Sequence, residues 1–212
     1  STLFAKIQWI IMRNLAYKFR PTTLENFIGQ KHLLAQDAPL RIIIEKNIQD
    51  SNMLPNLLFF GPPGSGKTSL AHIIATLSKK TFLSFNATNF KLDSLKKELS
   101  LYEHTMNKPL LFIDEVHRLN IAQQEFLLPI LEKGQVAFIG ASTENPFFTL
   151  SPALRSRSFL FELKALQTQD FEELYNRVLK AYPPKHSFVS IKSWLLNNHN
   201  GDCRAFLILP LI

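Results

Sequence analysis

Hydrophobic positions along the chain alternate between short apolar runs and segments with helical spacing. Leu57–Phe60 is a continuous apolar run that ends at glycine and proline, which predicts a buried strand entering a turn. The next apolar positions lie on one face of a helix: Leu70, Ile73, Ile74 and Leu77. Further strands are predicted at 81–87, 110–113 and 135–142, with helices around 92–99 and 121–131.

Strands that alternate with helices predict an α/β fold, with a parallel sheet covered by helices on both faces. Residues 158–163 are a candidate for one more strand, and from Thr168 onward the pattern is only helical. The later apolar positions of this part are Phe171, Leu174, Val178, Leu179, Ile191, Trp194 and Leu195. We therefore expect an N-terminal extension over 1–14, a sheet domain over 15–163 and a partial helical domain over 164–212.

The two ends of the chain have unusual apolar patterns. Residues 1–11 carry apolar side chains at helical spacing but lack the cleavage site of a signal peptide, so the extension is either an amphipathic helix or disordered. An equally good interpretation is that Met12 is the natural start. The last seven residues, FLILPLI, form an apolar tail with Pro210 inside it. This tail indicates a fragment that has lost sequence, so whether 1–11 and 206–212 are native stays open.

Composition restricts the class of protein. A chain of 212 residues with 46% hydrophobic residues is long enough for one large domain, or one domain and a small appendage. The lone Cys203 excludes a disulfide framework and fits a reducing compartment. No apolar stretch is long enough to span a membrane. The formal charge of +7 allows nucleic acid as a partner without establishing it.

The first chemical motif lies between the 57–60 strand and the helix that follows it. GPPGSGKT fits G-x-x-x-x-G-K-[ST] in the strand–turn–helix context that a phosphate-binding loop requires. Its glycines allow backbone N–H groups to surround phosphate oxygens, at a helix N-terminus. We expect Lys67 to contact the β- and γ-phosphates of ATP, and the Thr68 hydroxyl to bind Mg²⁺. The predicted nucleotide-binding residues of this loop are Gly61, Pro62, Pro63, Gly64, Ser65, Gly66, Lys67, Thr68 and Ser69. The alternative is a glycine- and proline-rich turn that matches by chance.

The second motif is the apolar run at 110–113 followed by Asp114 and Glu115. The run predicts a strand that places Asp114 beside the phosphate loop, where its carboxylate can hold Mg²⁺ or its water ligands. Glu115 is the candidate that polarises the attacking water. An isolated Asp-Glu pair is usually a solvated loop, but this pair directly follows a strand downstream of a phosphate loop.

These motifs together resemble those of AAA+ ATPases. The segments YKFRP at 17–21 and FIGQ at 27–30 are similar to the N-terminal segment of clamp-loader subunits and RuvB-type motors. FIGQKHLL, DEVHRLNIAQQEFLLPILEKG and FIGASTENPFF are similar to the replication-associated recombination protein A (RarA/MgsA) family. HRLNIAQQ and STENPFF are the discriminating pieces, because clamp loaders and RuvB share the other motifs.

The resemblance implies roles for further residues. Thr143 matches sensor 1, a hydroxyl that detects the γ-phosphate or positions water; otherwise it is an ordinary β-branched residue at a strand end. Arg157 resembles the arginine finger that reaches a neighbouring subunit's site. Arg155 is its competitor, and either arginine could be a plain surface residue.

Two more site predictions depend on the resemblance. Arg204 matches the sensor 2 arginine of the helical lid, although the sequence after it departs from the family pattern. The predicted adenine pocket consists of Arg20, Pro21, Ile28 and Gly29, for which an ordinary loop is the alternative. His32, His72, His104, His186 and His199 show no metal-ligand spacing. His117 and Arg118 lie two and three residues after Glu115, where they could couple the site to a neighbour or to DNA.

The resemblance implies a Mg²⁺-dependent, DNA-associated ATPase of the cytoplasm and nucleoid. It would act at stalled forks, recombination intermediates or single-strand/duplex junctions, as a homo-oligomer in the intact protein. A single-strand-binding or replisome protein is open as a partner. Two alternatives remain: a clamp-loader-like or RuvB-like motor subunit, and a truncated nucleotide-binding module with little turnover.

Overall fold

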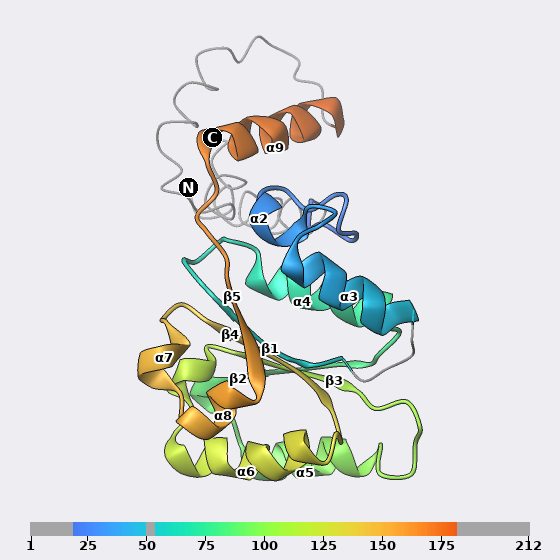
Figure 1. Cartoon of the computed structure of the whole chain (residues 1–212), viewed down its shortest axis with the longest axis vertical. Coiled ribbons are helices and arrows are strands. Elements are labelled where there is room, and N and C mark those ends of the chain that lie inside the picture. The colour runs from blue at the N-terminus through green and yellow to red at the C-terminus, as the bar shows by residue number, and fades with distance from the viewer. Residues whose placement is uncertain (1–18, 50–53, 182–212) are drawn as a thin grey trace, which may run out of the picture. The chain divides into compact units, whose positions relative to one another are not determined.

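The computed structural model of the chain describes residues 19–49 and 54–181 (Figure 1). The backbone divides into two compact units, each assembled from segments that are distant in the sequence. Unit 2 contains 31–61 and 67–163, and unit 1 contains the described parts of 1–30 and 164–212 together with 62–66. The N-terminal extension, predicted to be helical or disordered, lies outside the described residues, as do the apolar positions after 182, Cys203 and Arg204.

A five-stranded parallel sheet forms the centre of unit 2 and confirms the predicted fold class. Its strands are β1 (Asn56–Phe60), β2 (Phe82–Asn86), β3 (Leu110–Asp114), β4 (Ala137–Ser142) and β5 (Ser158–Glu162). They lie in the order β2-β3-β4-β1-β5, with every neighbouring pair parallel. The register pairs Phe60 with Ser142 and Asn86 with Asp114. The carboxyl ends of β1, β2, β3 and β4 therefore lie along one edge of the sheet.

Helices cover both faces of this sheet, as the alternating pattern predicts. In Figure 1, α3 (Pro39–Gln49) and α4 (Lys67–Leu77) lie on one face, and α5 (Leu92–Ser100) and α6 (Ile121–Glu132) lie on the other. The sequence analysis did not predict α3 or the short α2 (Lys31–Leu34) before it. Both are held by apolar burial, since Leu33, Leu40 and Ile44 are all buried.

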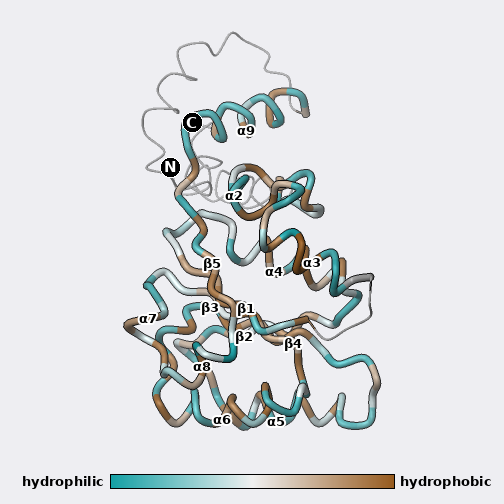
Figure 2. The backbone as a smooth tube through the Cα atoms, viewed as in Figure 1, coloured by the Kyte–Doolittle hydropathy of each residue, from teal (hydrophilic) through white to brown (hydrophobic). Residues whose placement is uncertain are grey.

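The core of unit 2 is continuous between the sheet and the α5–α6 layer. All six residues of β4 are buried, as expected for a strand covered on both faces. The buried side chains of this core cluster include Leu58, Leu95, Leu111, Leu127 and Phe138. Figure 2 shows the hydrophobic colour concentrated along the strands. This packing fixes the strand ends that carry the site.

Short capped elements follow the strands at the carboxyl edge. These are η1 (Ala87–Asn89) after β2, η2 (Val116–Arg118) after β3, and α7 (Pro146–Thr149) and α8 (Pro152–Ser156) after β4. The side chains of Asn86, Asn145 and Ser151 accept backbone N–H groups at the starts of η1, α7 and α8. The chain at this edge is therefore ordered by local hydrogen bonds rather than by long loops.

Unit 1 contains α9 (Thr168–Ala181), which confirms the helical pattern predicted from Thr168 onward. Its buried face carries Phe171, Leu174 and Tyr175, which pack with Leu166 and with Phe19 and Ile28 of the N-terminal segment. Within the described ranges, no helix combines the length and hydropathy needed to cross a membrane.

Candidate functional site

The loop between β1 and α4 needs glycine at its motif positions. Gly61, Gly64 and Gly66 have φ values of 143°, 74° and 101°, which residues with a side chain rarely adopt. A Cβ atom at Gly61 would lie 1.9 Å from the carbonyl oxygen of Leu163. A Cβ atom at Gly66 would lie 2.5 Å from the ring of Phe27. The backbone conformation and the close packing of this loop therefore explain why the motif has glycine at these positions.

The loop also presents polar groups suited to an anion. The Lys67 side chain is buried at the start of α4, and its Nζ donates to the carbonyl oxygen of Gly61 at 2.7 Å. Ser65 is buried as well, and its hydroxyl has no hydrogen-bond partner among the described residues. A buried hydroxyl without a partner fits a phosphate oxygen, because buried polar groups are normally satisfied. Pro62 and Pro63 are exposed, and Ser69 lies in the first turn of α4.

Thr68 and Asp114 line one open pocket of about 500 Å³ in unit 2. Ser84 and Asn86 of β2 also line it, together with Lys91 before α5. Hydroxyl and carboxylate oxygens are the donors that Mg²⁺ prefers, and Mg²⁺ commonly takes only one or two protein ligands besides substrate phosphates and water. The described residues contain no group of three or more His, Cys, Asp or Glu side chains able to enclose a metal. These residues therefore fit Mg²⁺ held jointly with a nucleotide.

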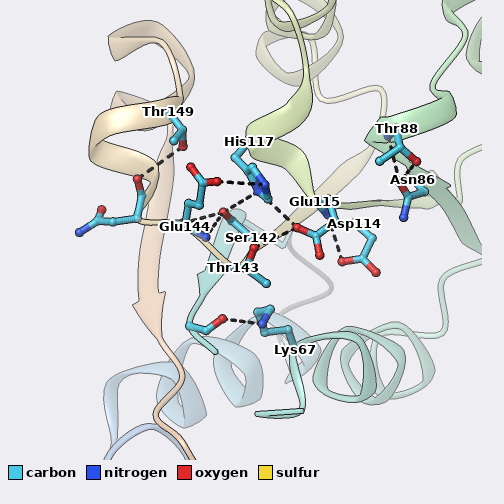
Figure 3. Close-up of polar contacts among 12 residues, drawn as sticks. Lys67, Asn86, Thr88, Asp114, Glu115, His117, Ser142, Thr143, Glu144 and Thr149 are labelled. Carbon is cyan, nitrogen blue, oxygen red and sulfur yellow. Dashed lines mark hydrogen bonds and ion pairs between the residues drawn. The ribbon is translucent and has the colours of Figure 1, made fainter. Parts of the chain in front are cut away.

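Glu115 lies in the turn that leaves β3, with a left-handed backbone (φ 52°, ψ 40°). Its N–H donates to Oδ1 of Asp114 at 3.0 Å, and its carbonyl accepts the N–H of Arg118 at 2.8 Å. The Thr143 hydroxyl at the end of β4 donates to Oε2 of Glu115 at 3.2 Å (Figure 3). The structure thus brings together Glu115, the predicted water activator, and Thr143, for which the family resemblance implies the sensor 1 role.

A histidine not assigned a catalytic role from the sequence completes this cluster. His117 has a side chain only 6% exposed, with Nδ1 3.0 Å from Ser142 Oγ and 3.4 Å from Glu115 Oε2. Its Nε2 lies 3.6 Å from Oε1 of Glu144. Figure 3 shows the imidazole between the two carboxylates, with Ser142 and Thr143 beside it. The only sequence signal was the position of His117 two residues after Glu115.

The two candidate arginine fingers have different surroundings. Arg157 is 40% exposed and forms an ion pair with Glu132, with 2.6 Å between NH2 and Oε1. The Arg155 guanidinium lies over the Phe147 ring, and its Nε is buried without a hydrogen-bond partner in the described part of the chain. Arg157 is the more accessible of the two to a neighbouring molecule.

The predicted adenine-pocket residues lie in unit 1. Ile28 packs on the α9 cluster, and a Cβ atom at Gly29 would lie 2.6 Å from Leu166. Arg20 and Pro21 precede them in the same segment, and the adenine pocket stays a prediction. Gln30, which the sequence pattern did not single out, is a buried side chain that donates to the Lys164 carbonyl at 2.7 Å and accepts the Lys164 N–H at 2.9 Å.

The fold and this edge define the class of protein: a P-loop ATPase domain of the AAA+ type. Three features define this class: the parallel strand order β2-β3-β4-β1-β5, the loop with Lys67 after β1, and the carboxylates of Asp114 and Glu115 at the end of β3. The sequence model of the family described as the Holliday junction DNA helicase RuvB P-loop domain matches residues 19–152. The chain belongs to that family.

Comparison with individual proteins adds a narrower likeness. The chain is 42% identical over 170 residues to replication-associated recombination protein A of Bacillus subtilis, covering 79% of this chain and 38% of that protein. It is 40% identical over 204 residues to the Haemophilus influenzae protein of the same name, and the alignment covers 91% of this chain and 44% of that protein. These relatives confirm the predicted resemblance. The chain spans about two fifths of their length.

A solved structure is also similar to this chain. The Thermotoga maritima RuvB Holliday junction branch migration motor aligns with a TM-score of 0.73 and 27% sequence identity. The alignment covers 89% of this chain and 63% of the RuvB chain. The AAA+ fold predicted from the sequence is thereby confirmed.

Proposed function

We propose that this chain is the ATPase core of a DNA-associated motor that couples ATP hydrolysis to action at stalled forks or recombination intermediates. The observation that carries the proposal is the convergence of Lys67, Thr68, Asp114, Glu115 and Thr143 at one edge of the sheet. The replication and recombination roles in the names of its relatives, and the formal charge of +7, support DNA as the partner.

In this proposal the nucleotide binds to the loop between β1 and α4 and to the carboxyl ends of the strands. Backbone N–H groups around the loop glycines and the Lys67 ammonium hold the phosphates of ATP. Thr68 and Asp114 supply the oxygens for Mg²⁺, which when bound neutralises charge on the β- and γ-phosphates. The base would lie against Arg20, Pro21, Ile28 and Gly29.

Glu115 activates the water for hydrolysis. Its carboxylate accepts a proton as the water oxygen bonds to the γ-phosphorus and the bond to the β–γ bridging oxygen breaks, giving ADP and phosphate. The Thr143 hydroxyl holds Oε2 of Glu115 at 3.2 Å, which directs the other carboxylate oxygen away from it and toward water. In this proposal Asp114 serves Mg²⁺ instead, and its Oδ1 also accepts the Glu115 N–H.

A second subunit completes the site in this proposal. Arg157 would leave Glu132 and stabilise the charge that develops on a neighbour's γ-phosphate, so turnover requires a homo-oligomer. Arg204 is proposed to contribute from the helical lid. A single-strand-binding or replisome protein would recruit the assembly to DNA in the cytoplasm and nucleoid.

The experiment is steady-state ATP turnover of this chain, with and without forked DNA, with the Glu115→Gln variant as the blank. Stimulation by forked DNA that disappears in Glu115→Gln supports the proposal. Turnover at the level of the blank, with ATP still bound, identifies a nucleotide-binding module instead. Forked DNA that changes neither turnover nor ATP affinity removes the DNA part of the proposal.

The match to the RuvB family favours one second candidate, a branch-migration motor. The HRLNIAQQ and STENPFF stretches distinguish the chain from it. ATP-driven unwinding of a four-way junction, at a rate above that of forked DNA, would favour the RuvB-like candidate.

A further inference from the structure

The turn that carries Glu115 needs support from its neighbours. A left-handed backbone is unfavourable for a residue with a Cβ atom and is seldom kept unless surrounding contacts fix it. Two backbone hydrogen bonds hold the main chain of Glu115, but neither acts on its carboxylate. The orientation of the carboxylate must therefore come from side chains packed against it.

His117 is placed to supply that orientation. The Ser142 hydroxyl donates to the Glu144 carbonyl at 2.6 Å and accepts the Glu144 N–H at 2.9 Å. Since its single proton is already used, Ser142 Oγ must accept from Nδ1–H of His117 at 3.0 Å. The same Nδ1 edge faces Glu115 Oε2 at 3.4 Å, within ion-pair distance of that carboxylate.

We propose that His117 is a positioning residue for hydrolysis, holding the Glu115 carboxylate through Nδ1–H while Ser142 and Glu144 hold the imidazole. With Thr143, His117 places two donors beside Oε2 and leaves Oε1 for the attacking water. This inference rests on the proposed role of Glu115 in ATP hydrolysis. It assigns His117 no contact with ATP.

The position of the cluster predicts a selective kinetic effect. The phosphates are proposed to be held by the loop and Lys67, whereas the polar contacts that place His117 are with Glu115, Ser142 and Glu144. Loss of the imidazole should therefore lower kcat and leave the KM for ATP within about twofold. Misplacing a reacting group by about 1 Å can reduce a rate by about 100-fold, so we expect kcat to fall roughly 10- to 100-fold.

Matched variants separate positioning from simple space filling. His117→Leu fills part of the volume without a donor, whereas His117→Asn places an amide N–H where Nδ1–H lies. We expect most of kcat to return in His117→Asn. His104→Leu makes the same replacement at an exposed histidine and should match the unaltered chain.

The kinetic test compares these variants with Glu115→Gln in the full chain. A fall in kcat for His117→Leu with recovery in His117→Asn supports the inference. Full kcat in His117→Leu, while Glu115→Gln is inactive, overturns the inference and leaves the proposed function intact. Full turnover in Glu115→Gln instead refutes the proposed role of Glu115.

Side-chain nitrogen NMR gives an answer that needs neither turnover nor a stable Leu variant. The His117 signals are those missing from His117→Asn, and we expect them to show a protonated Nδ1. They should shift in Glu115→Gln while the signals of His104 stay unchanged. An unprotonated Nδ1, or His117 signals that do not respond to Glu115→Gln, would overturn the inference.

Discussion

Gly140 lies in β4 directly beneath the turn that carries Glu115, and replacing it with alanine tests how tightly that turn is packed. An added Cβ atom would lie 2.7 Å from Cδ2 of Leu58 and 3.2 Å from both Val116 Cγ1 and the Phe138 ring. All of these side chains belong to the buried core. The backbone of Gly140 lies outside the left-handed region, so steric crowding is the only cost.

The magnitude follows from two opposing effects. Overpacking a well-filled core costs about 1–3 kcal/mol. Alanine in a strand regains about 0.5–1 kcal/mol that glycine loses in conformational entropy. We therefore expect Gly140→Ala to lower the free energy of unfolding by about 1–2 kcal/mol. At about 2–4 °C per kcal/mol for a chain of this size, Tm should fall by roughly 2–8 °C.

A double-mutant cycle with Leu58→Val isolates the contact. Valine lacks the Cδ2 atom that the new methyl group meets, so Gly140→Ala should cost little more in that background. We expect a coupling of about 1 kcal/mol, measured by urea unfolding followed by circular dichroism, with unchanged m-values. A Gly140→Ala variant as stable as the unaltered chain would refute the reasoning. So would stabilities that add within about 0.5 kcal/mol.

Three further predictions concern the loop, α6 and the exposed arginine. Gly61→Ala should lower the free energy of unfolding by at least about 2 kcal/mol, because the new methyl group meets the Leu163 carbonyl and φ is 143°. An unchanged Tm in calorimetry would contradict this. Gln124→Leu should lower the free energy of unfolding in urea by about 1–3 kcal/mol, because the buried amide accepts the Ser151 N–H and donates to the Leu119 carbonyl. Equal urea midpoints for the variant and the unaltered chain would contradict this. Arg157→Ala should change the free energy of unfolding by less than about 1 kcal/mol, since its pair with Glu132 is exposed. Mixing Arg157→Ala chains with Glu115→Gln chains should restore ATP turnover, because each variant supplies the residue that the other lacks. Mixtures as inactive as the separate variants would exclude a role in a neighbour's site.

The order of strands and helices in the sheet domain could be predicted because it depends on local hydrophobic spacing. The strand after the phosphate loop's helix was expected at 81–87 and is observed at Phe82–Asn86. The strand expected to begin at Gln135 begins at Ala137, because the Gln135 N–H bonds to Ile130 and closes the turn after α6. Local patterns therefore locate elements well, and hydrogen bonds at their ends adjust the bounds.

The candidate site was predictable only where a motif fixes the chemistry within a few residues. Lys67, Thr68, Asp114 and Glu115 follow from two short motifs, and the structure brings them to one edge. The role of His117 depends on the register between β3 and β4, which no local pattern reveals. The left-handed backbone of Glu115 is equally invisible, since glutamate has no preference for it.

The hydrogen bonds between the two discriminating stretches have a consequence for how relatives of this chain diverge. HRLNIAQQ contributes His117 and Gln124, whose partners are Ser142 in STENPFF, 25 residues from His117, and the N–H of Ser151 shortly after it. Replacing His117 or Ser142 alone leaves the other without this partner. We therefore expect His117 and Ser142 to be replaced together rather than singly. A hybrid that took only one of them from a clamp loader would carry orphaned polar groups at the edge where ATP chemistry is proposed to occur.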